Sequence, residues 1–346
     1  MTREDVRRRL DAAWQEPLSA ASRRLACLLG GALGDAVGYR VEFKRWPEIE
    51  RAHGSDGIRL AACKGPLVVS DDTQMTLFTL EGMARAKRVE DIVTEVREAY
   101  LDWLHTQGYG SERPLRGDLA KVTALKHLRA PGTTCLSALR RGGRGTVKSA
   151  TNDSKGCGGV MRTAPLGFLP VSVSDTDVFL LGAECAALTH GHPDGYLPAG
   201  AMAVLTRDAL HDVPWDASIV KVLELTRAWP KSQGTAQAIE SAVKAAADGV
   251  ASRARVDALG EGWVGEEALA VGLYAAMVAR TFAECVELAA NHAGDSDSTA
   301  SIAGQLWGAR FGLGGIAREA VERVDVIEAL LGAFAEWERV SQVWTR

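Results

Sequence analysis

Apolar residues recur at three- and four-residue spacing through most of this chain, and this helical period constrains the fold more than any other feature. In residues 21–39 the apolar positions with this spacing are Leu25, Leu28, Leu29, Leu33 and Ala36. Ser22 precedes them and is predicted to cap the helix. Comparable patterns occupy residues 89–105, 177–190, 199–210, 217–229, 235–251, 266–279, 281–292, 299–312 and 326–340. Strand patterns are scarce, with residues 67–69 as a short candidate, so we predict an all-α fold.

The chain shows no fixed-period repeat and no low-complexity linker that would divide its 346 residues. We therefore predict one compact domain, residues 21–346, preceded by an N-terminal arm, residues 1–20. Two long irregular stretches, near 105–118 and 129–159, are rich in glycine and hydroxyl residues. Loops of this length inside a compact domain are functional more often than idle, and disorder is the alternative.

Composition argues against several classes of protein. The formal net charge is -4 and the arginines are spread along the chain, so we expect no nucleic-acid partner. The six cysteines form no CxxC pair, which favours a reduced, cytoplasmic protein. The first residues carry charges of both signs, and no segment approaches the ~20 apolar residues that span a bilayer. We expect neither export nor membrane insertion.

Two segments place carboxylates beside apolar runs. The sequence SDDTQM, residues 70–75, follows the apolar run LVV. A solvated helix start, capped by Ser70 or Asp71, would explain these acids without any function. The sequence GDAVGYRVEF, residues 34–43, ends a predicted helix in glycines and supplies Asp35 and Glu42. Glycine-rich helix ends are common, so this segment alone is equally compatible with a structural role.

A third acidic segment, NHAGDSDST at residues 291–299, again places carboxylates and hydroxyls at a helix start. Two such starts can meet in the core only if their charges are neutralised, because buried carboxylates repel one another. Mg²⁺ and Mn²⁺ prefer oxygen ligands, and the sequence has no CxxC or HExxH zinc pattern. A pair of such ions can hold a diol and generate a hydroxide-like nucleophile. The sequence thus predicts a site for two divalent cations.

Five ordered motifs give the chain a resemblance to a known family. They are GALGDAVGYRVEF, SDDTQM, SKGCGGVMRTAPLG, LTHGHP and AGDSDSTASIAGQLWGARFG. With them the chain resembles the ADP-ribosylglycohydrolase family, which includes dinitrogenase-reductase-activating glycohydrolases and ADP-ribosyl-arginine hydrolases. The resemblance extends from about Leu25 to Gly315. It implies an orthogonal multi-helix domain with a binuclear metal site in a central cleft.

The resemblance also implies roles for the acidic residues. The implied metal ligands come from the two acidic helix starts: Ser70, Asp71, Asp72, Asp295, Asp297 and Ser298. The implied ions are two divalent cations, Mg²⁺ first and Mn²⁺ as the alternative. The implied catalytic residues, which would assist proton transfer or gate the substrate, are Glu42, Asp71 and Asp72.

The glycine-rich motif resembles the family's ligand loop, whose backbone N–H groups can approach a diphosphate closely. The implied substrate-binding residues are Gly110, Ser154, Lys155, Gly156, Gly158 and His190. Cys157 stands where relatives commonly have asparagine. Arg162 could pair with phosphate or anchor a helix start. His190 could instead simply close a helix before the proline turn.

The implied reaction is hydrolysis of the N-glycosidic bond between ADP-ribose and a protein side chain, with arginine as the expected side chain. Other ADP-ribose linkages remain open. The alternative is an immunity-type binding protein that blocks an ADP-ribosyltransferase by contact through its N-terminal arm, with or without hydrolase activity. Val6, Leu10 and Trp14 share one helical face of the arm, suited to packing on the body or to entering a partner's groove.

Overall fold

The computed structural model describes residues 3–110 and 113–344, and its regular structure is helical. Among these residues no β-strand forms, which confirms the all-α prediction. Leu67 pairs with Val324, and Gly156 with Val264, as isolated bridges only. The strand candidate at residues 67–69 therefore contributes a single bridge. None of the described helices combines the length and hydropathy needed to cross a bilayer.

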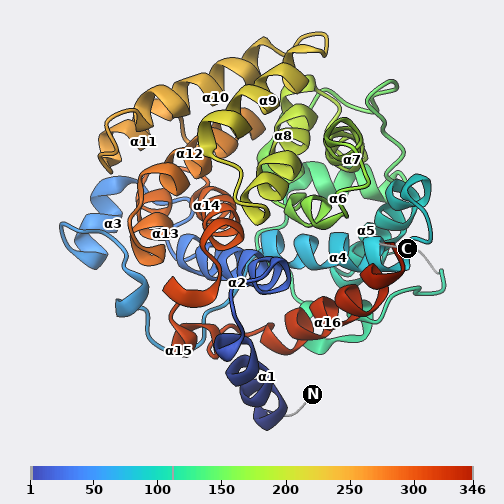
Figure 1. Cartoon of the computed structure of the whole chain (residues 1–346), viewed down its shortest axis with the longest axis horizontal. Coiled ribbons are helices and arrows are strands. Elements are labelled where there is room, and N and C mark those ends of the chain that lie inside the picture. The colour runs from blue at the N-terminus through green and yellow to red at the C-terminus, as the bar shows by residue number, and fades with distance from the viewer. Residues whose placement is uncertain (1–2, 111–112, 345–346) are drawn as a thin grey trace.

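The helices pack into one compact body in which α2, α4 and α14 lie near the centre and the other helices surround them (Figure 1). In chain order the α-helices are α1 (Arg3–Gln15), α2 (Ala20–Gly38), α3 (Trp46–His53), α4 (Asp71–Arg85), α5 (Ile92–Thr106), α6 (Thr133–Arg140), α7 (Asp175–Ala187), α8 (Pro193–Leu210), α9 (Trp215–Arg227), α10 (Gln233–Ala246), α11 (Arg253–Leu259), α12 (Gly265–Val278), α13 (Phe282–Ala290), α14 (Ser296–Phe311), α15 (Arg318–Val321) and α16 (Ile327–Trp344).

Helices α2 and α14 approach each other backbone to backbone. A Cβ atom added to Gly34 would lie 2.0 Å from the carbonyl oxygen of Ala300, and one added to Gly38 would lie 2.1 Å from that of Ser296. Gly304 faces Gly30 in the same way, one turn earlier in α2 and one turn later in α14. Late residues of α2 thus face early residues of α14, so the pair is antiparallel. This register brings the carboxyl end of α2 beside the amino end of α14.

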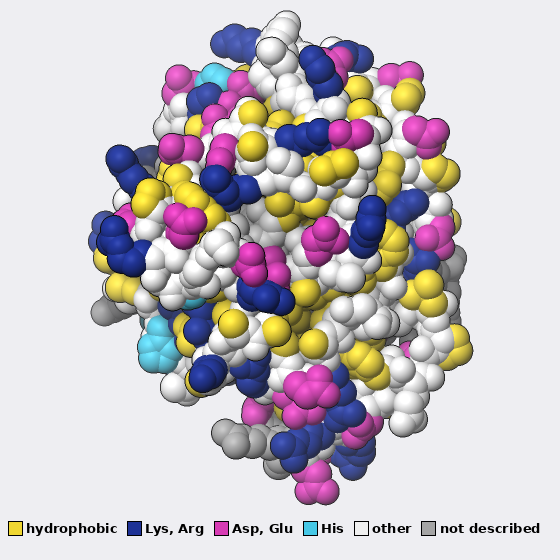
Figure 2. All heavy atoms as spheres, turned by 90° about the vertical axis from the view of Figure 1, so that its left-hand side faces the viewer, with side chains coloured by type: hydrophobic (Ala, Val, Ile, Leu, Met, Phe, Trp, Pro, Cys, Tyr) yellow, Lys and Arg dark blue, Asp and Glu magenta, His cyan; other side chains and the backbone are white. Residues whose placement is uncertain are grey.

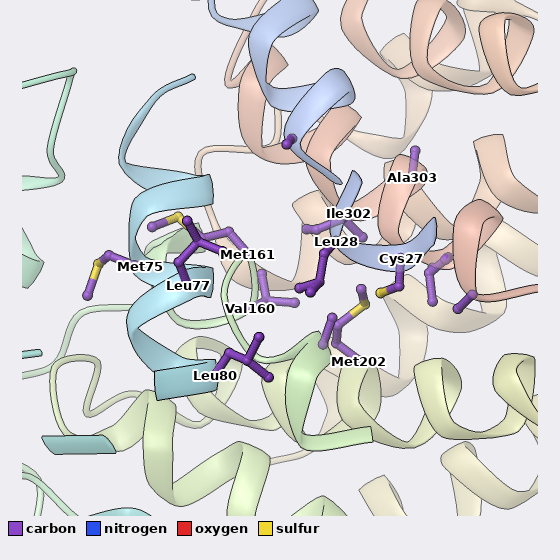
Figure 3. Close-up of a cluster of buried hydrophobic side chains, with 14 of the residues drawn as sticks. Cys27, Leu28, Met75, Leu77, Leu80, Val160, Met161, Met202, Ile302 and Ala303 are labelled. Atoms are coloured by element: carbon purple, nitrogen blue, oxygen red, sulfur yellow. The ribbon is translucent and has the colours of Figure 1, made fainter. Parts of the chain in front are cut away.

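The apolar core lies directly beneath these helix ends. Its side chains come from α2, α4, α8, α14 and the segment before Arg162, and they converge on one cluster (Figure 3). Members of this cluster are Leu28, Met75, Leu77, Leu80, Val160, Met161, Met202 and Ile302. Full burial of one such side chain stabilises the fold by about 1.5–3 kcal/mol. The helices that carry the acidic motifs therefore share one buried core.

Two local predictions need correction. The N-terminal cap of α2 is Ser19 rather than Ser22, which occupies the third helical position. The Ser19 hydroxyl accepts from the Ser22 backbone N–H at 3.1 Å, and the Ser22 hydroxyl accepts from the Ser19 N–H at 2.8 Å. The second irregular stretch, residues 129–159, contains α6, because burial of Cys135 and Leu139 supports a two-turn helix there.

The N-terminal helix α1 packs on the body. Val6 and Leu10 are 5% and 0% exposed and belong to the main core, while Trp14 packs against it half-buried. Ion pairs join Asp11 to Arg318 and Arg7 to Glu322. The division into an arm, residues 1–20, and a domain, residues 21–346, stays a prediction, since α1 shares the core of the rest.

Candidate active site

A cavity of about 340 Å³ brings the two acidic helix starts together. Its lining includes five carboxyl groups, from Glu42, Asp71, Asp72, Asp295 and Asp297. Ser298, Gly156, Gly158 and His190 also line it. The antiparallel α2–α14 pair explains the meeting, because it sets Glu42, just past α2, beside the first turn of α14. Residues predicted from separate motifs thus share one site.

The first acidic start is held in place by a carboxylate from α2. Asp35 is fully buried and accepts from the Ser70 backbone N–H at 2.8 Å. It also accepts from the Thr73 N–H at 3.0 Å and the Thr73 hydroxyl at 2.5 Å. Ser70 caps α4 by accepting from the Asp72 N–H at 3.2 Å. Asp35 therefore fixes how α4 presents Asp71 and Asp72, although the sequence analysis gave it no role in the site.

The second acidic start is organised by its own cap. Asp295 caps α14, accepting from the Ser298 N–H at 3.4 Å. The Cys157 thiol donates to the other oxygen of Asp295 at 2.8 Å. This contact links the glycine-rich loop to the acidic turn. Cys157 thus supplies a side-chain hydrogen bond to the acidic turn.

Burial makes these carboxyl groups weak acids in the absence of a cation. The pKa of Glu42 rises to about 9, first because of burial and then because of Asp295 and Asp71 nearby. Burial also raises the pKa values of Asp71, Asp72 and Asp297 well above the ordinary range. Removing ionised carboxylates from water is costly unless opposite charge compensates them. The cluster therefore favours bound positive charge.

The donor set fits a hard cation. One oxygen each of Glu42, Asp72 and Asp297 is buried and has no hydrogen-bond partner among the described residues. Ligand atoms of Glu42, Asp295 and Asp297 lie within 4.8 Å of one another. Buried oxygens without partners at this spacing suit Mg²⁺ or Mn²⁺. The acidic cluster can thus hold a metal ion, as predicted, while the number and identity of the ions stay predictions.

The glycine-rich loop lies against His190. A Cβ atom added to Gly158 would lie 3.1 Å from His190 Cε1, and one added to Gly156 would lie 3.4 Å from Nε2. Gly156 and Gly158 carry no side chain, and both line the cavity. The Cys157 N–H donates to the Trp263 carbonyl at 3.2 Å, which ties this loop to the segment before α12.

His190 is buried and held by a chain of polar contacts. Burial, aided by the positive charge of Arg162, lowers the pKa of His190 to about 3, so the ring is neutral. Arg162 donates to the Thr189 hydroxyl at 2.7 Å, and that hydroxyl lies 2.8 Å from His190 Nδ1. Arg162 itself is fully buried and lies over the Tyr100 ring at 4.4 Å. These contacts support the alternative in which Arg162 is a structural anchor over the one in which it pairs with phosphate.

Four predicted residues do not line the cavity. Gly110 is exposed and lies beside His105 on the loop after α5. Lys155 is paired with Glu266 at 2.6 Å, and the Ser154 hydroxyl lies 3.1 Å from that of Thr134. The fourth is the capping residue of α4, Ser70. Their ligand-binding roles stay predictions.

Sequence reasoning also missed part of the lining: the segment from Ala130 to Cys135, Met161 and two aromatic residues. Phe43 and Trp263 both border the cavity. Phe43 ends the first motif, which was a usable signal, whereas nothing in the local sequence marked Trp263.

Comparison with known proteins agrees with this geometry. The family model described as ADP-ribosylglycohydrolase matches residues 16–343. The chain belongs to the ADP-ribosylglycohydrolase family. The resemblance inferred from the five motifs is thus confirmed over nearly the whole chain.

Two relatives and one solved structure are similar to the chain over most of its length. It is 25% identical over 311 residues to "ADP-ribosylarginine hydrolase Tri1" of Pseudomonas putida (strain GB-1), covering 89% of this chain and 76% of the relative. It is 26% identical over 347 residues to "ADP-ribosyl-[dinitrogen reductase] glycohydrolase" of Rhodospirillum rubrum, covering 91% and 98%. A solved "ADP-ribosylglycohydrolase-related protein complex" has the same fold, with a TM-score of 0.63, 24% identity, and coverage of 93% and 99%.

Proposed function

We propose that this protein is a divalent-cation-dependent hydrolase that removes ADP-ribose from arginine side chains of proteins. The observation that carries the proposal is the meeting of both acidic helix starts and Glu42 in one cavity. Family membership supports glycohydrolase chemistry, and the arginine linkage follows the name of the Pseudomonas relative. The substrate is accordingly an ADP-ribosylated protein.

Hydrolysis forms a bond from a water oxygen to the anomeric carbon of the ribose and breaks the bond from that carbon to the arginine nitrogen. One proton of the water is lost and the leaving nitrogen gains one. The Glu42 carboxyl lies among the acidic residues and is the group proposed to carry a proton between these positions. The backbone from Gly156 to Gly158 is proposed to hold the diphosphate, with His190 as a neutral neighbour.

Divalent cations, when bound, neutralise the carboxylates, hold the ribose hydroxyls and make water more acidic. Asp71, Asp72, Asp295 and Asp297 would hold them, with the Ser298 hydroxyl as a further oxygen donor. We propose two ions, and the oxygen-rich donor set supports Mg²⁺, with Mn²⁺ as the alternative.

The test is release of ADP-ribose from an arginine-ADP-ribosylated peptide with Mg²⁺, with Mn²⁺ and with EDTA. Asp295→Ala should abolish release while the protein stays folded. Asp118→Ala is the matched control, because the Asp118 side chain is 94% exposed and lies outside the cavity lining. Release that persists in EDTA, or in Asp295→Ala, would contradict the proposal.

The alternative role, blocking an ADP-ribosyltransferase by contact, relied on the apolar face of the arm. Val6 and Leu10 bury that face against the body. Val6 and Leu10 are thus not presented to a partner, and no other observation among the described residues favours the blocking role over hydrolysis.

A further inference from the structure

Two aromatic rings form a wall at the mouth of the acidic cavity. The ring centroids of Phe43 and Trp263 are 5.4 Å apart and their planes differ by 21°. Phe43 is 68% exposed and Trp263 is 37% exposed. Both rings border the cavity, and both also border an outer hollow of about 550 Å³ next to α3 and α11. We call this pair the aromatic wall. The aromatic wall thus borders both hollows.

Backbone conformation and hydrogen bonds hold the two rings of the aromatic wall in place. Phe43 has a φ of 63°, a left-handed conformation that is unusual for a phenylalanine, and it directly follows Glu42. The Trp263 indole N–H donates to a Glu261 carboxylate oxygen at 3.1 Å. The Trp263 carbonyl accepts from the Cys157 N–H, which ties the ring to the glycine-rich loop. Both rings are thus held by segments that also form the cavity.

The surroundings of the wall differ on its two sides. Inside, the described lining has five carboxyl groups and neither lysine nor arginine. Outside, charges of both signs are mixed, as on the wider face that carries α3 and α11 (Figure 2). A cationic group therefore gains most where the rings adjoin the carboxylates.

We propose that the aromatic wall binds the guanidinium group of the ADP-ribosylated arginine and so selects arginine over neutral linkages. This proposal rests on the proposed function and names the residues that set its specificity. A guanidinium is planar and cationic, and it stacks favourably on aromatic faces within about 6 Å. The exposed surface of Phe43 and Trp263 offers such faces beside Glu42. A serine linkage has no cation for the rings to hold.

The proposal predicts different effects on two measurements. In Trp263→Leu and Phe43→Leu, kcat/KM for an arginine-ADP-ribosylated peptide should fall roughly tenfold. The Kd of free ADP-ribose, measured by calorimetry with Mg²⁺, should change less than about twofold, because ADP-ribose lacks the guanidinium. Trp263→Phe and Phe43→Tyr keep an aromatic face and should restore most of the loss. Phe311→Leu is the control, since Phe311 is 45% exposed at the far end of α14.

The possible outcomes distinguish failure of the aromatic wall from failure of the proposed function. Unchanged kcat/KM in both leucine variants of a protein that cleaves the arginine linkage would reject the wall alone. A roughly tenfold rise in the Kd of ADP-ribose would also reject it, because the rings would then contact the nucleotide. Wild-type protein that binds ADP-ribose but leaves the arginine linkage intact would contradict the proposed function, and the wall with it. Loss confined to the arginine peptide, restored by the aromatic variants, would support the wall.

Discussion

At the scale of single residues, the carboxyl groups of the cavity conflict with their surroundings. Glu42, Asp72 and Asp297 each keep one buried oxygen without a partner among the described residues. Such groups destabilise a fold at neutral pH unless they are protonated or a cation compensates them. The acidic cluster therefore lowers the stability of the cation-free fold, and a bound cation would compensate for this loss.

This conflict predicts a pH dependence for the cation-free protein. Carboxyl groups have pKa values near 4 when unfolded, whereas the pKa of Glu42 in the fold rises to about 9. The folded state therefore binds more protons, and stability is lost as pH rises from about 4 toward 9. In EDTA, the Tm should fall between pH 5 and pH 8 by on the order of 3 °C. Mg²⁺ should raise the Tm more at pH 8 than at pH 5, as thermal scans would show.

Two asparagine variants, each of which removes one carboxylate, separate the acidic cluster from the rest of the protein. Asp297→Asn should raise the Tm in EDTA at pH 8 and lose the Mg²⁺ effect, while Asp118→Asn should behave like wild type. A Mg²⁺ increment that is the same at both pH values would show that these carboxylates are not its source.

Asp35 carries a second prediction at this scale. Asp35→Asn would place an amide NH₂ against one of the N–H donors of Ser70 and Thr73, which leaves that buried donor unsatisfied. The free energy of unfolding should fall by about 1–3 kcal/mol. Because the start of α4 would shift, kcat/KM should fall by on the order of tenfold. Thr73→Val removes only a hydroxyl donor and should cost less. Asp35→Asn with wild-type Tm and kcat/KM would refute the positioning role.

At the scale of elements, the α2–α14 pair determines which helix ends meet. Glycines at four-residue spacing let the two backbones touch, and their register sets Glu42 beside Asp297. Side chains at these positions would separate the helices and widen the cavity. The acidic cluster therefore depends on residues that carry no functional group.

Gly304→Ala tests this dependence. The new Cβ would lie 2.1 Å from the Gly30 carbonyl oxygen, so the helices must shift. Overpacking of this kind costs about 1–3 kcal/mol. The matched control is Gly332→Ala in α16, where a Cβ meets nothing within 4 Å. It should stabilise the protein by about 0.5–1 kcal/mol through helix propensity. Denaturant unfolding would compare them, and equal stabilities would count against close backbone packing.

The three- and four-residue spacing of apolar residues predicted most helices, because their apolar faces are long. It did not predict where each helix ends or which helix it packs against. Ser19 and Ser22 are chemically equivalent caps, and only the fold decides between them. The short helix α6 has too few apolar positions to show a period. The four-residue glycine spacing in α2 is visible in the sequence, yet it does not reveal that α14 is the partner.

At the scale of the whole molecule, the site combines segments from both ends of the chain. The motif resemblance predicted that the acidic starts meet, and the structure agrees. It could not predict that Phe43 stacks on Trp263, because two residues so distant in sequence become neighbours only through tertiary packing. It also implied a ligand contact for Gly110, which is not among the residues that line the cavity, and this contact stays a prediction.

The arm provides the last prediction. Leu10 is fully buried between α1 and the body, so Leu10→Ala should lower the free energy of unfolding by about 2–5 kcal/mol. Leu18→Ala, at a leucine that is 58% exposed, should change it by less than about 1 kcal/mol. Since α1 contributes no residue to the acidic cavity, kcat at 25 °C should be preserved in both variants. Denaturant unfolding and release of ADP-ribose would measure the two effects.

Two results would contradict this prediction. A loss of kcat in folded Leu10→Ala would show that the arm acts on the site. A free energy of unfolding equal to that of Leu18→Ala would show that packing of the arm contributes little stability.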